Sequence, residues 1–241
     1  MTDPLVVDLY SGDVGGRPSW STLAAAGEPW CGAIIKATQD TYTSGWFVDN
    51  WQPLRAAGHE RYASTWWRGA YHYLNVGGNP VAQACAYLAA VDAAGGWGAG
   101  DLWPIVDVER AGNTGASKQQ TIDTVSEWSD AIVRRVARRP MLYGGSFLRD
   151  LGITDHMGCQ LLWFPRWSAT LPESAYGAIG WTRAELWGWQ YCGDGTASLP
   201  GYPATSPIGK VDITAMVIDD AAGPAAPNQW THAHVGSWPL A

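Results

Sequence analysis

Short apolar runs recur along the chain, and several are followed by segments with helical spacing. Runs of about four to eight residues that are rich in Val, Ile, Leu, Tyr and Trp indicate β-strands. Eight such runs occupy residues 5–10, 32–38, 68–74, 102–109, 139–145, 161–167, 185–191 and 210–216. Because strands alternate with helical segments, the pattern predicts an α/β protein with a parallel sheet.

Three segments have the spacing or the end signals of helices. Residues 48–58 end at a glycine, and residues 80–96 have a proline at the start and a double glycine at the end. Residues 117–139 place apolar side chains at helical spacing and basic residues in the last turn. Eight strands with helices after several of them predict a barrel, which we expect to be irregular in its second half because the connections there are shorter.

The length of 241 residues is enough for one sizeable domain, and two would be cramped. The segment 221–229 reads as a linker, so we predict a catalytic barrel over 1–220 and a linker with a C-terminal tail over 221–241. The sequence contains no apolar stretch of about 18 residues, so no transmembrane helix is predicted. The first residues lack a basic region and a long apolar run, so they do not resemble a signal peptide.

Composition narrows the function classes. The net charge of −7 argues against a nucleic-acid-binding protein that relies on phosphate contacts. The 16 Trp and 10 Tyr greatly outnumber the 3 Phe, and such rings suit surfaces that are half apolar and half wet. The four cysteines are far apart and form no C-x-x-C motif, which argues against a zinc cluster and favours reduced thiols, although this spacing leaves a disulfide open.

The positions of the acidic residues are the most informative feature. Asp8 lies near the end of the first run, Asp107 and Glu109 close the fourth, and Asp212 lies in the last. A carboxylate on an apolar strand is costly unless it lies in a polar site or is paired. Since catalytic groups of barrels come from the C-terminal ends of strands, we expect these four carboxylates to share one site.

Asp107 and Glu109 have the spacing of a catalytic pair. Two positions apart on a strand, they lie on one face, about 6.6 Å apart along the backbone. Their repulsion raises the pKa of one of them, which gives the protonated acid and ionised partner that glycoside hydrolysis needs. Aromatic residues near strand ends would suit sugar rings, namely Tyr71, Trp103, Tyr143, Trp163, Trp187, Trp189 and Tyr191.

Simpler roles exist for the same residues. Acidic residues at strand ends also cap helices or bind Ca²⁺. About half of the tryptophans are expected to pack in the core, Trp128 among them, and His72 is expected to be a core or supporting histidine rather than a catalytic one. Trp230 and Trp238 are expected to pin the tail to the barrel.

Residues 5 to about 218 resemble the family 25 glycoside hydrolases, the lysozyme-type muramidases of bacteria and phages. The motifs that carry the resemblance occur in the family's order: VVDLYSG, RGAYHYL, WPIVDVE, LYGGSFL, LLWFPRW and LWGWQYCGDGTASLPG…VDITAM. The resemblance implies an irregular, flattened TIM-like barrel of eight strands with fewer helices. It also implies that peptidoglycan is the substrate, cut at the β-1,4 bond between N-acetylmuramic acid and N-acetylglucosamine.

Carried over residue by residue, the resemblance implies Glu109 as general acid and Asp107 as its partner, with Asp8 and Asp212 completing an acidic cluster. The expected substrate contacts are Tyr71, Tyr143, Trp163, Trp189, Gln190 and Tyr191. No metal or cofactor is expected, and the protein is expected to be a monomer. Synthesis in the cytoplasm without a signal peptide would fit a phage endolysin or a delivered effector acting on the bacterial cell wall.

The sequence departs from the family pattern at Gln39, which stands where the family usually has an acid. Residues 61–67 also read unlike the family's usual apolar strand. Two alternatives stay open: a non-catalytic barrel that binds cell-wall glycan, and a hydrolase of another N-acetylated polysaccharide such as chitin. Whether hydrolysis inverts or retains configuration is also open.

Overall fold

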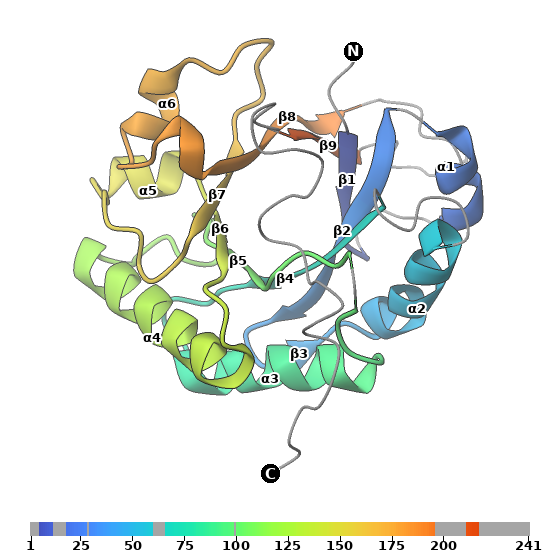
Figure 1. Ribbon diagram of the computed structural model, residues 1–241. Helices are drawn as coiled ribbons and strands as arrows, with labels where there is room; N and C mark the ends of the chain where they lie inside the picture. Colours follow the sequence, from blue (N-terminus) through green and yellow to red (C-terminus); the bar gives the residue numbers. More distant parts are fainter. Residues whose placement is uncertain are drawn as a thin grey trace.

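The protein is described by a computed structural model over residues 5–11, 18–27, 29–59, 66–98, 100–195 and 211–216. Within these residues one sheet has the order β1-β9-β8-β7-β6-β5-β4-β2-β3, and pairing of β1 with β2 closes it into a barrel (Figure 1). Its strands are β1 (Leu5–Leu9), β2 (Trp30–Gln39), β3 (Tyr42–Thr43), β4 (Trp67–Tyr73), β5 (Ile105–Asp107), β6 (Met141–Tyr143), β7 (Leu161–Pro165), β8 (Leu186–Gly195) and β9 (Val211–Met216). Each predicted run overlaps one barrel strand, and β3 is an added hairpin partner of β2. The predicted irregular barrel of eight strands is confirmed.

The direction of the last strand differs from the prediction of a parallel sheet. β9 runs antiparallel to both β1 and β8, whereas the other neighbouring strands of the barrel run parallel. Antiparallel neighbours need no crossover helix between them. The start of β9 therefore lies at the barrel end where the other strands finish, and Asp212 lies opposite Asp8 in the register.

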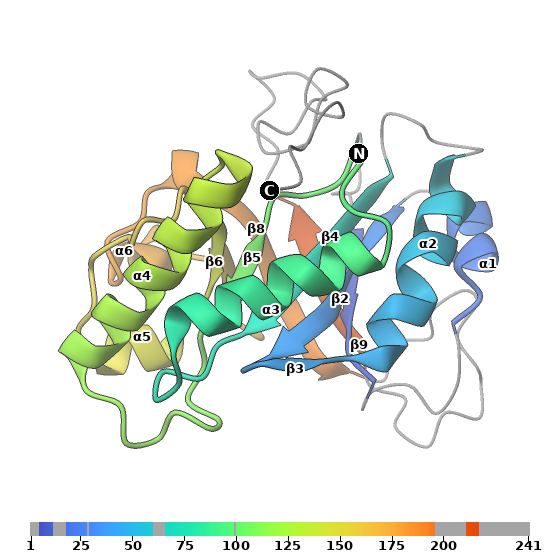
Figure 2. The same ribbon diagram turned by 90° about the horizontal axis from the view of Figure 1, so that it is seen from below.

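Helices pack around the outside of the barrel. They are α1 (Trp20–Ala26), α2 (Gly45–His59), α3 (Pro80–Ala93), α4 (Lys118–Val136), α5 (Ser146–Asp150) and α6 (Glu173–Gly177), with a 3₁₀ turn η1 (Arg183–Glu185). Viewed from below, α3 and α4 lie side by side, and α1 and α2 cover the neighbouring flank (Figure 2). The three predicted helices correspond to α2, α3 and α4.

The ends of these helices follow local chemistry. The Asn79 side chain accepts a hydrogen bond from the first turn of α3, with Pro80 in the first helical position, and Ser117 caps α4 in the same way. Gly95 and Gly96 follow α3 with φ of 100° and 72°, conformations that favour glycine. Gly58 does not end its helix as predicted, because α2 continues to His59.

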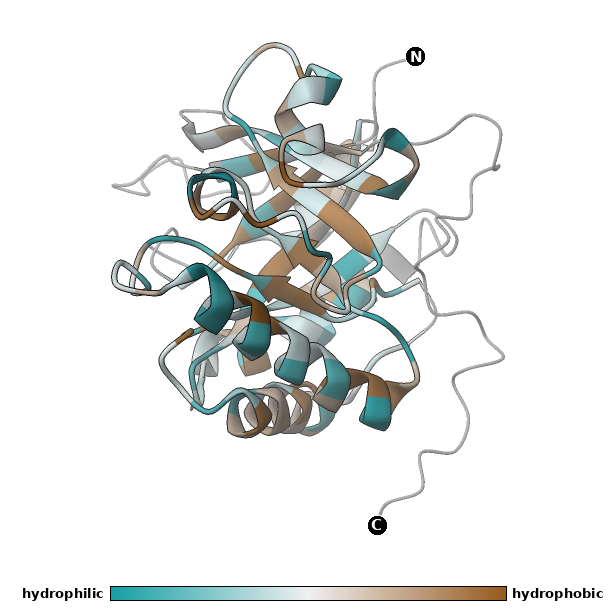
Figure 3. Ribbon diagram, turned by 90° about the vertical axis from the view of Figure 1, so that its left-hand side faces the viewer, coloured by the Kyte–Doolittle hydropathy of each residue, from teal (hydrophilic) through white to brown (hydrophobic). Residues whose placement is uncertain are grey.

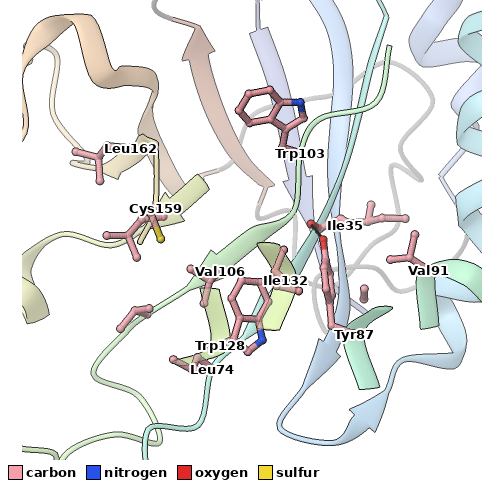
Figure 4. Close-up of a cluster of buried hydrophobic side chains, with 14 of the residues drawn as sticks. Ile35, Leu74, Tyr87, Val91, Trp103, Val106, Trp128, Ile132, Cys159 and Leu162 are labelled. Carbon is pink, nitrogen blue, oxygen red and sulfur yellow. Dashed lines mark hydrogen bonds between the residues drawn. The ribbon is translucent and has the colours of Figure 1, made fainter. Parts of the chain in front are cut away.

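Alternation along the strands divides the core in two. Side chains that face into the barrel include Val6, Ile34, Tyr71, Ile105, Met141 and Trp163. The opposite faces pack against the helices, where Trp128 of α4 is fully buried beside Tyr87 and Val106 (Figure 4). Figure 3 shows hydrophobic positions concentrated on the strands, with polar ones on outward-facing helices and loops. The prediction that Trp128 is a core residue is confirmed.

His72 is a buried core residue, as predicted. Its ring stacks on Trp128 with centroids 5.5 Å apart. Its Nδ1 lies 2.7 Å from Thr38 Oγ1, and its Nε2 lies 3.2 Å from Gln83 Oε1. Gln83 Oε1 already accepts from the Asn75 backbone N–H, so His72 Nε2 carries the proton and donates. Burial lowers the pKa of His72 to about 4, which keeps the ring neutral.

Two tryptophans that were expected beside a sugar groove lie elsewhere. Trp103 is 7% exposed and belongs to the core between barrel and helices (Figure 4). The Arg138 guanidinium lies over its ring. Trp187 is 4% exposed and fills the barrel interior against Trp163. The prediction that both flank the groove is wrong. Each tryptophan comes before the C-terminal end of its predicted strand, where the groove was expected, and its ring packs in the core.

Residues 221–241, the predicted linker and tail with Trp230 and Trp238, lie outside the described residues. In the part of the chain that is described, no helix combines the length and apolar character needed to cross a membrane. No disulfide joins Cys31, Cys85, Cys159 and Cys192, which all lie in described segments.

Candidate active site

A cavity of about 370 Å³ opens at the barrel end where the parallel strands finish. It contains all four carboxylates singled out in the sequence, so we call it the acidic cavity. The described residues that line it are Asp8, Tyr10, Lys36, Gln39, Tyr71, Tyr73, Asp107, Glu109, Ala111, Gly112, Tyr143, Trp163 and Asp212. Seven of the ten residues expected to form the site therefore meet in one place.

Strand register explains why these side chains meet. Asp107, Tyr143 and Trp163 are direct partners across β5, β6 and β7, so they form one inward-facing layer. Apolar side chains such as Ile105 and Met141 fill the layer below. Glu109 lies two residues beyond Asp107 and also lines the cavity, although β5 has already ended.

The buried side chain of Gln190 links two of the carboxylates, Asp8 and Asp212, by hydrogen bonds. Its Nε2 donates to Asp8 Oδ2 at 3.0 Å and to Asp212 Oδ2 at 3.2 Å. Its Oε1 accepts from the Tyr143 hydroxyl at 2.9 Å and from Trp167 Nε1 at 3.0 Å. The indole N–H can only donate, which fixes the orientation of the amide. Gln190 is 1% exposed and does not line the cavity, and in the structure its amide contacts Asp8 and Asp212.

A bulge in β8 explains the place of Gln190. Leu162 pairs with Leu186, but Trp163 pairs with Gly188, so Trp187 is an extra residue in β8. One extra residue exchanges the two faces of a strand from that point onward. Gln190 consequently faces the barrel interior.

The same bulge carries Trp189 and Tyr191 to the other face of β8, where their rings lie 5.8 Å apart. Trp189 Nε1 donates to the Arg166 carbonyl at 2.7 Å. Neither ring lines the acidic cavity, and their contact with substrate stays a prediction.

Two carboxyl groups in the cavity, those of Asp107 and Glu109, have raised pKa values. Burial raises the pKa of Asp107 well above its ordinary value, and the charge of Glu109 adds to this. Asp8 and Asp212 raise it further, and Lys36 opposes them. Asp107 Oδ1 is buried without a hydrogen-bond partner among the described residues, so its neutral form is favoured or a substrate donor completes it.

Burial also raises the pKa of Glu109. The hydroxyl of Tyr143 and the charge of Lys36 lower it, whereas Asp212 raises it. The Tyr143 hydroxyl has one proton, which it can donate to ionised Glu109 or to Gln190 Oε1; while it donates to Gln190, its oxygen can accept a hydrogen bond from neutral Glu109. The site thus contains carboxyl groups whose protonated form is favoured relative to an ordinary carboxyl group, beside further carboxylates.

Comparison with models of known families matches residues 7–199 to glycosyl hydrolases family 25. The chain belongs to glycosyl hydrolase family 25. Solved structures share its fold: a bacterial lysozyme from Streptomyces coelicolor is 22% identical, with a TM-score of 0.71 over 92% of this chain and 95% of that one. A family 25 glycosyl hydrolase from Bacillus anthracis is 18% identical, with a TM-score of 0.68 over 91% of each chain.

A relative found by sequence comparison matches only part of the chain. The YegX protein of Escherichia coli O6:H1 is 27% identical over 143 residues, which are 59% of this chain and 48% of that protein. The chain thus matches about half the length of this relative.

Several residues of this family 25 site were not predicted as site residues from the sequence, among them Tyr10, Lys36, Gln39 and Tyr73. Lys36 Nζ lies 4.4 Å from the Tyr73 ring centroid and 5.4 Å from that of Tyr10. It also donates to Gln39 Oε1 at 2.7 Å. Lys36 could have been found by alternation, because it lies two residues after the inward-facing Ile34.

Among the described residues, no three His, Cys, Asp or Glu side chains are arranged to hold a metal ion. In the acidic cavity, Gln190 instead connects Asp8 and Asp212, and the charge of Lys36 acts on Asp107 and Glu109. A cavity in which two carboxyl groups with raised pKa values lie beside further carboxylates can supply a proton and stabilise positive charge nearby.

Proposed function

We propose that this protein is a lysozyme-type muramidase, which hydrolyses peptidoglycan at the β-1,4 bond between N-acetylmuramic acid and N-acetylglucosamine and acts at the bacterial cell wall. The observation that carries the proposal is the meeting of Asp8, Asp107, Glu109 and Asp212 in one cavity. Membership of glycosyl hydrolase family 25 supports it, as do relatives of the same fold that are named lysozymes and muramidases.

In this proposal Glu109 is the general acid. Its raised pKa favours the protonated form relative to an ordinary carboxyl group, and it lies beyond the end of β5. The proton passes to the glycosidic oxygen as the bond from that oxygen to the anomeric carbon breaks. The leaving sugar departs as an alcohol because it takes this proton. Water then adds its oxygen to the anomeric carbon, and the proton that this water loses returns to the carboxylates of the site and restores the acid.

Asp107 stabilises the reacting sugar in this proposal. Positive charge develops at the anomeric carbon during bond cleavage and favours the ionised form of Asp107, which in its buried position stabilises that charge more strongly than a carboxylate in water would. The free Oδ1 of Asp107 can also accept a hydrogen bond from the acetamido N–H of the sugar. Asp8 and Asp212, oriented by Gln190, keep the cavity negative.

Aromatic side chains would hold the sugar in place. Tyr71 and Trp163 line the cavity and are 8% and 2% exposed, so a sugar would contact the small part of each ring that the cavity leaves open. Trp163 Nε1 donates to Thr214 Oγ1 of β9 at 2.8 Å, across Gly188. A side chain at Gly188 would collide with Thr214 and approach the Trp163 ring. Glycine at this position therefore leaves room for the hydrogen bond between Trp163 and Thr214.

Replacement of Glu109 tests the proposal. The Glu109→Gln variant should lose about 100- to 10,000-fold of the rate at which reducing ends are released from purified peptidoglycan, because the amide cannot donate the proton. Glu127→Gln makes the same chemical change on the exposed face of α4 and should keep the wild-type rate. Full activity of Glu109→Gln would contradict the assignment of the general acid.

The identity of the cleaved bond is tested separately. Mass spectrometry of the digested wall should find N-acetylmuramic acid at the new reducing ends. N-acetylglucosamine there would contradict the proposed bond. Faster cleavage of chitin than of peptidoglycan would favour a hydrolase of another acetylated polysaccharide, and binding without cleavage would favour a non-catalytic glycan-binding barrel.

A further inference from the structure

A second cavity, of about 350 Å³, lies beside the acidic cavity. The two share Glu109, Ala111 and Tyr143. The second cavity is otherwise lined by residues that follow β5 and β6 and end β7, including Arg110, Ser146 and Trp167. Its volume falls within the range of about 300 to 1,000 Å³ that is usual for small-ligand sites.

The two cavities differ in charge. The acidic cavity holds Asp8, Asp107 and Asp212 in addition to Glu109. Among the described residues of the second cavity, the shared Glu109 is the carboxylate, and Arg110 is the basic residue. Carboxylates stabilise the sugar ring that becomes positive, so that ring belongs in the acidic cavity. A general acid protonates the oxygen between two sugars, so the sugar that leaves must lie on the other side of Glu109.

Trp167 gives the second cavity a surface suited to a sugar. Its side chain is 62% exposed, which is unusual for so large an apolar ring. One edge is fixed, because Nε1 donates to the buried Gln190. Gly193 lies so close to the ring that a side chain there would overlap it. The indole is thus held in place while much of its surface is open to solvent, as stacking against a sugar requires.

We propose that the second cavity binds the leaving-group sugar, an N-acetylhexosamine, and that Trp167 is the ring on which this sugar stacks. This proposal rests on the proposed function, since it assigns the two sides of the bond that Glu109 would protonate. It makes Trp167 a substrate-binding residue rather than a part of the proton-transfer machinery.

Three variants separate stacking from support of Gln190. Trp167→Ala removes both the ring and the hydrogen bond to Gln190. Trp167→Phe keeps a ring but loses the hydrogen bond. Gly193→Ala keeps Trp167 and displaces its ring. The measurements are kcat, KM and the pH profile of kcat/KM on soluble, uncross-linked glycan strands, with the thermal midpoint of each variant as a check of folding.

A stacking role predicts that kcat/KM falls about tenfold or more in Trp167→Ala and Gly193→Ala, and by less than about threefold in Trp167→Phe. The pH profile should not move in any variant. The leaving-group site is overturned if Trp167→Ala stays within about twofold of wild type. It is also overturned if Trp167→Phe is as impaired as Trp167→Ala, or if the profile moves, because Trp167 would then act through Gln190 on the carboxylates. A wild-type protein that releases no reducing ends overturns the proposed function, and the leaving-group site with it.

Discussion

Asp101 and Asp107 are both buried, at 2% and 6% exposed, yet they lie at opposite ends of the barrel. Asp101 lies at the end where the strands begin, beside Arg68 of β4. Arg68 donates to both of its oxygens, and the Gly98 backbone N–H donates to Oδ2 at 2.6 Å. Asp107 ends β5 at the other end of the barrel, where its Oδ1 lacks a described partner.

Burial acts in the same direction on both aspartates, so their neighbours account for the difference. Burial raises the pKa of each. At Asp101 the charge and hydrogen bonds of Arg68 oppose the increase, whereas at Asp107 the charge of Glu109 adds to it. A buried carboxylate with a matched cation is a structural group, and one among other carboxylates is a candidate for proton chemistry.

The largest expected effect is on the stability of the barrel end where Asp101 is paired with Arg68. Asp101→Asn leaves the buried Arg68 charge without its counter-charge, which should cost about 3–5 kcal/mol of the free energy of unfolding. Urea denaturation at neutral pH measures this. Asp92→Asn is the matched control, because Asp92 forms an exposed pair with Arg135 at 3.8 Å and should cost about 1 kcal/mol or less. An equally small loss of unfolding free energy in both variants would contradict the structural role of the Arg68–Asp101 pair.

The same substitution at the other end should have the opposite sign. Asp107→Asn should inactivate the protein and stabilise it at neutral pH. A carboxyl group whose folded pKa lies above its unfolded pKa favours folding while it is protonated, and this contribution is lost as pH rises through the folded pKa. The stabilisation should therefore be present at pH 7 and disappear near pH 4 and below.

The thermal midpoint measures this second prediction. Relief of about 1 kcal/mol should raise Tm by about 2–4 °C in a domain of this size. A lower Tm of Asp107→Asn at pH 7 would show that the ionised carboxylate is well satisfied in the folded protein, contrary to the contrast with Asp101.

The smallest expected effect comes from a substitution that adds an ion pair to the acidic cavity. Gln39→Glu places a carboxylate where Lys36 now donates to an amide. Lys36 lowers the pKa of Glu109, and partial neutralisation of its charge should raise that pKa. Activity needs protonated Glu109, so the alkaline limb of the kcat/KM profile should move to higher pH, by less than about one unit.

Lys36→Met should move that limb in the same direction. Lys118→Met is the control, since Lys118 is an exposed residue that bonds the Gly152 carbonyl at 2.6 Å. Movement of the limb to lower pH in Gln39→Glu would contradict the assigned effect of Lys36.

The sequence was sufficient to predict the barrel and the acidic cluster, because both depend on local patterns. Eight apolar runs marked the barrel strands, and Asp8, Asp107 and Glu109 marked the ends of two of them. Asp212 was placed in the site for an incomplete reason. It reaches the cavity from the start of an antiparallel strand, and strand direction depends on distant pairing that a local pattern does not contain.

Side-chain direction was harder to predict than strand position. Alternation fails after a bulge, and the bulge at Trp187 is formed by the pairing of β7 with β8. It turns Gln190 inward, which the sequence did not reveal. Trp103 was misplaced for a related reason, because it lies before β5 begins and packs toward the helices.

The position of β9 has a consequence for how the protein is made. This strand inserts between β1 and β8, so it completes the barrel by pairing with a strand from the other end of the chain. Such a distant contact forms late, because a long loop must close before it contributes. A ribosome releases β9 after the other described strands, and Asp212 comes with it. A growing chain therefore lacks both one wall of the acidic cavity and one of its four carboxylates until the last strand has been synthesised.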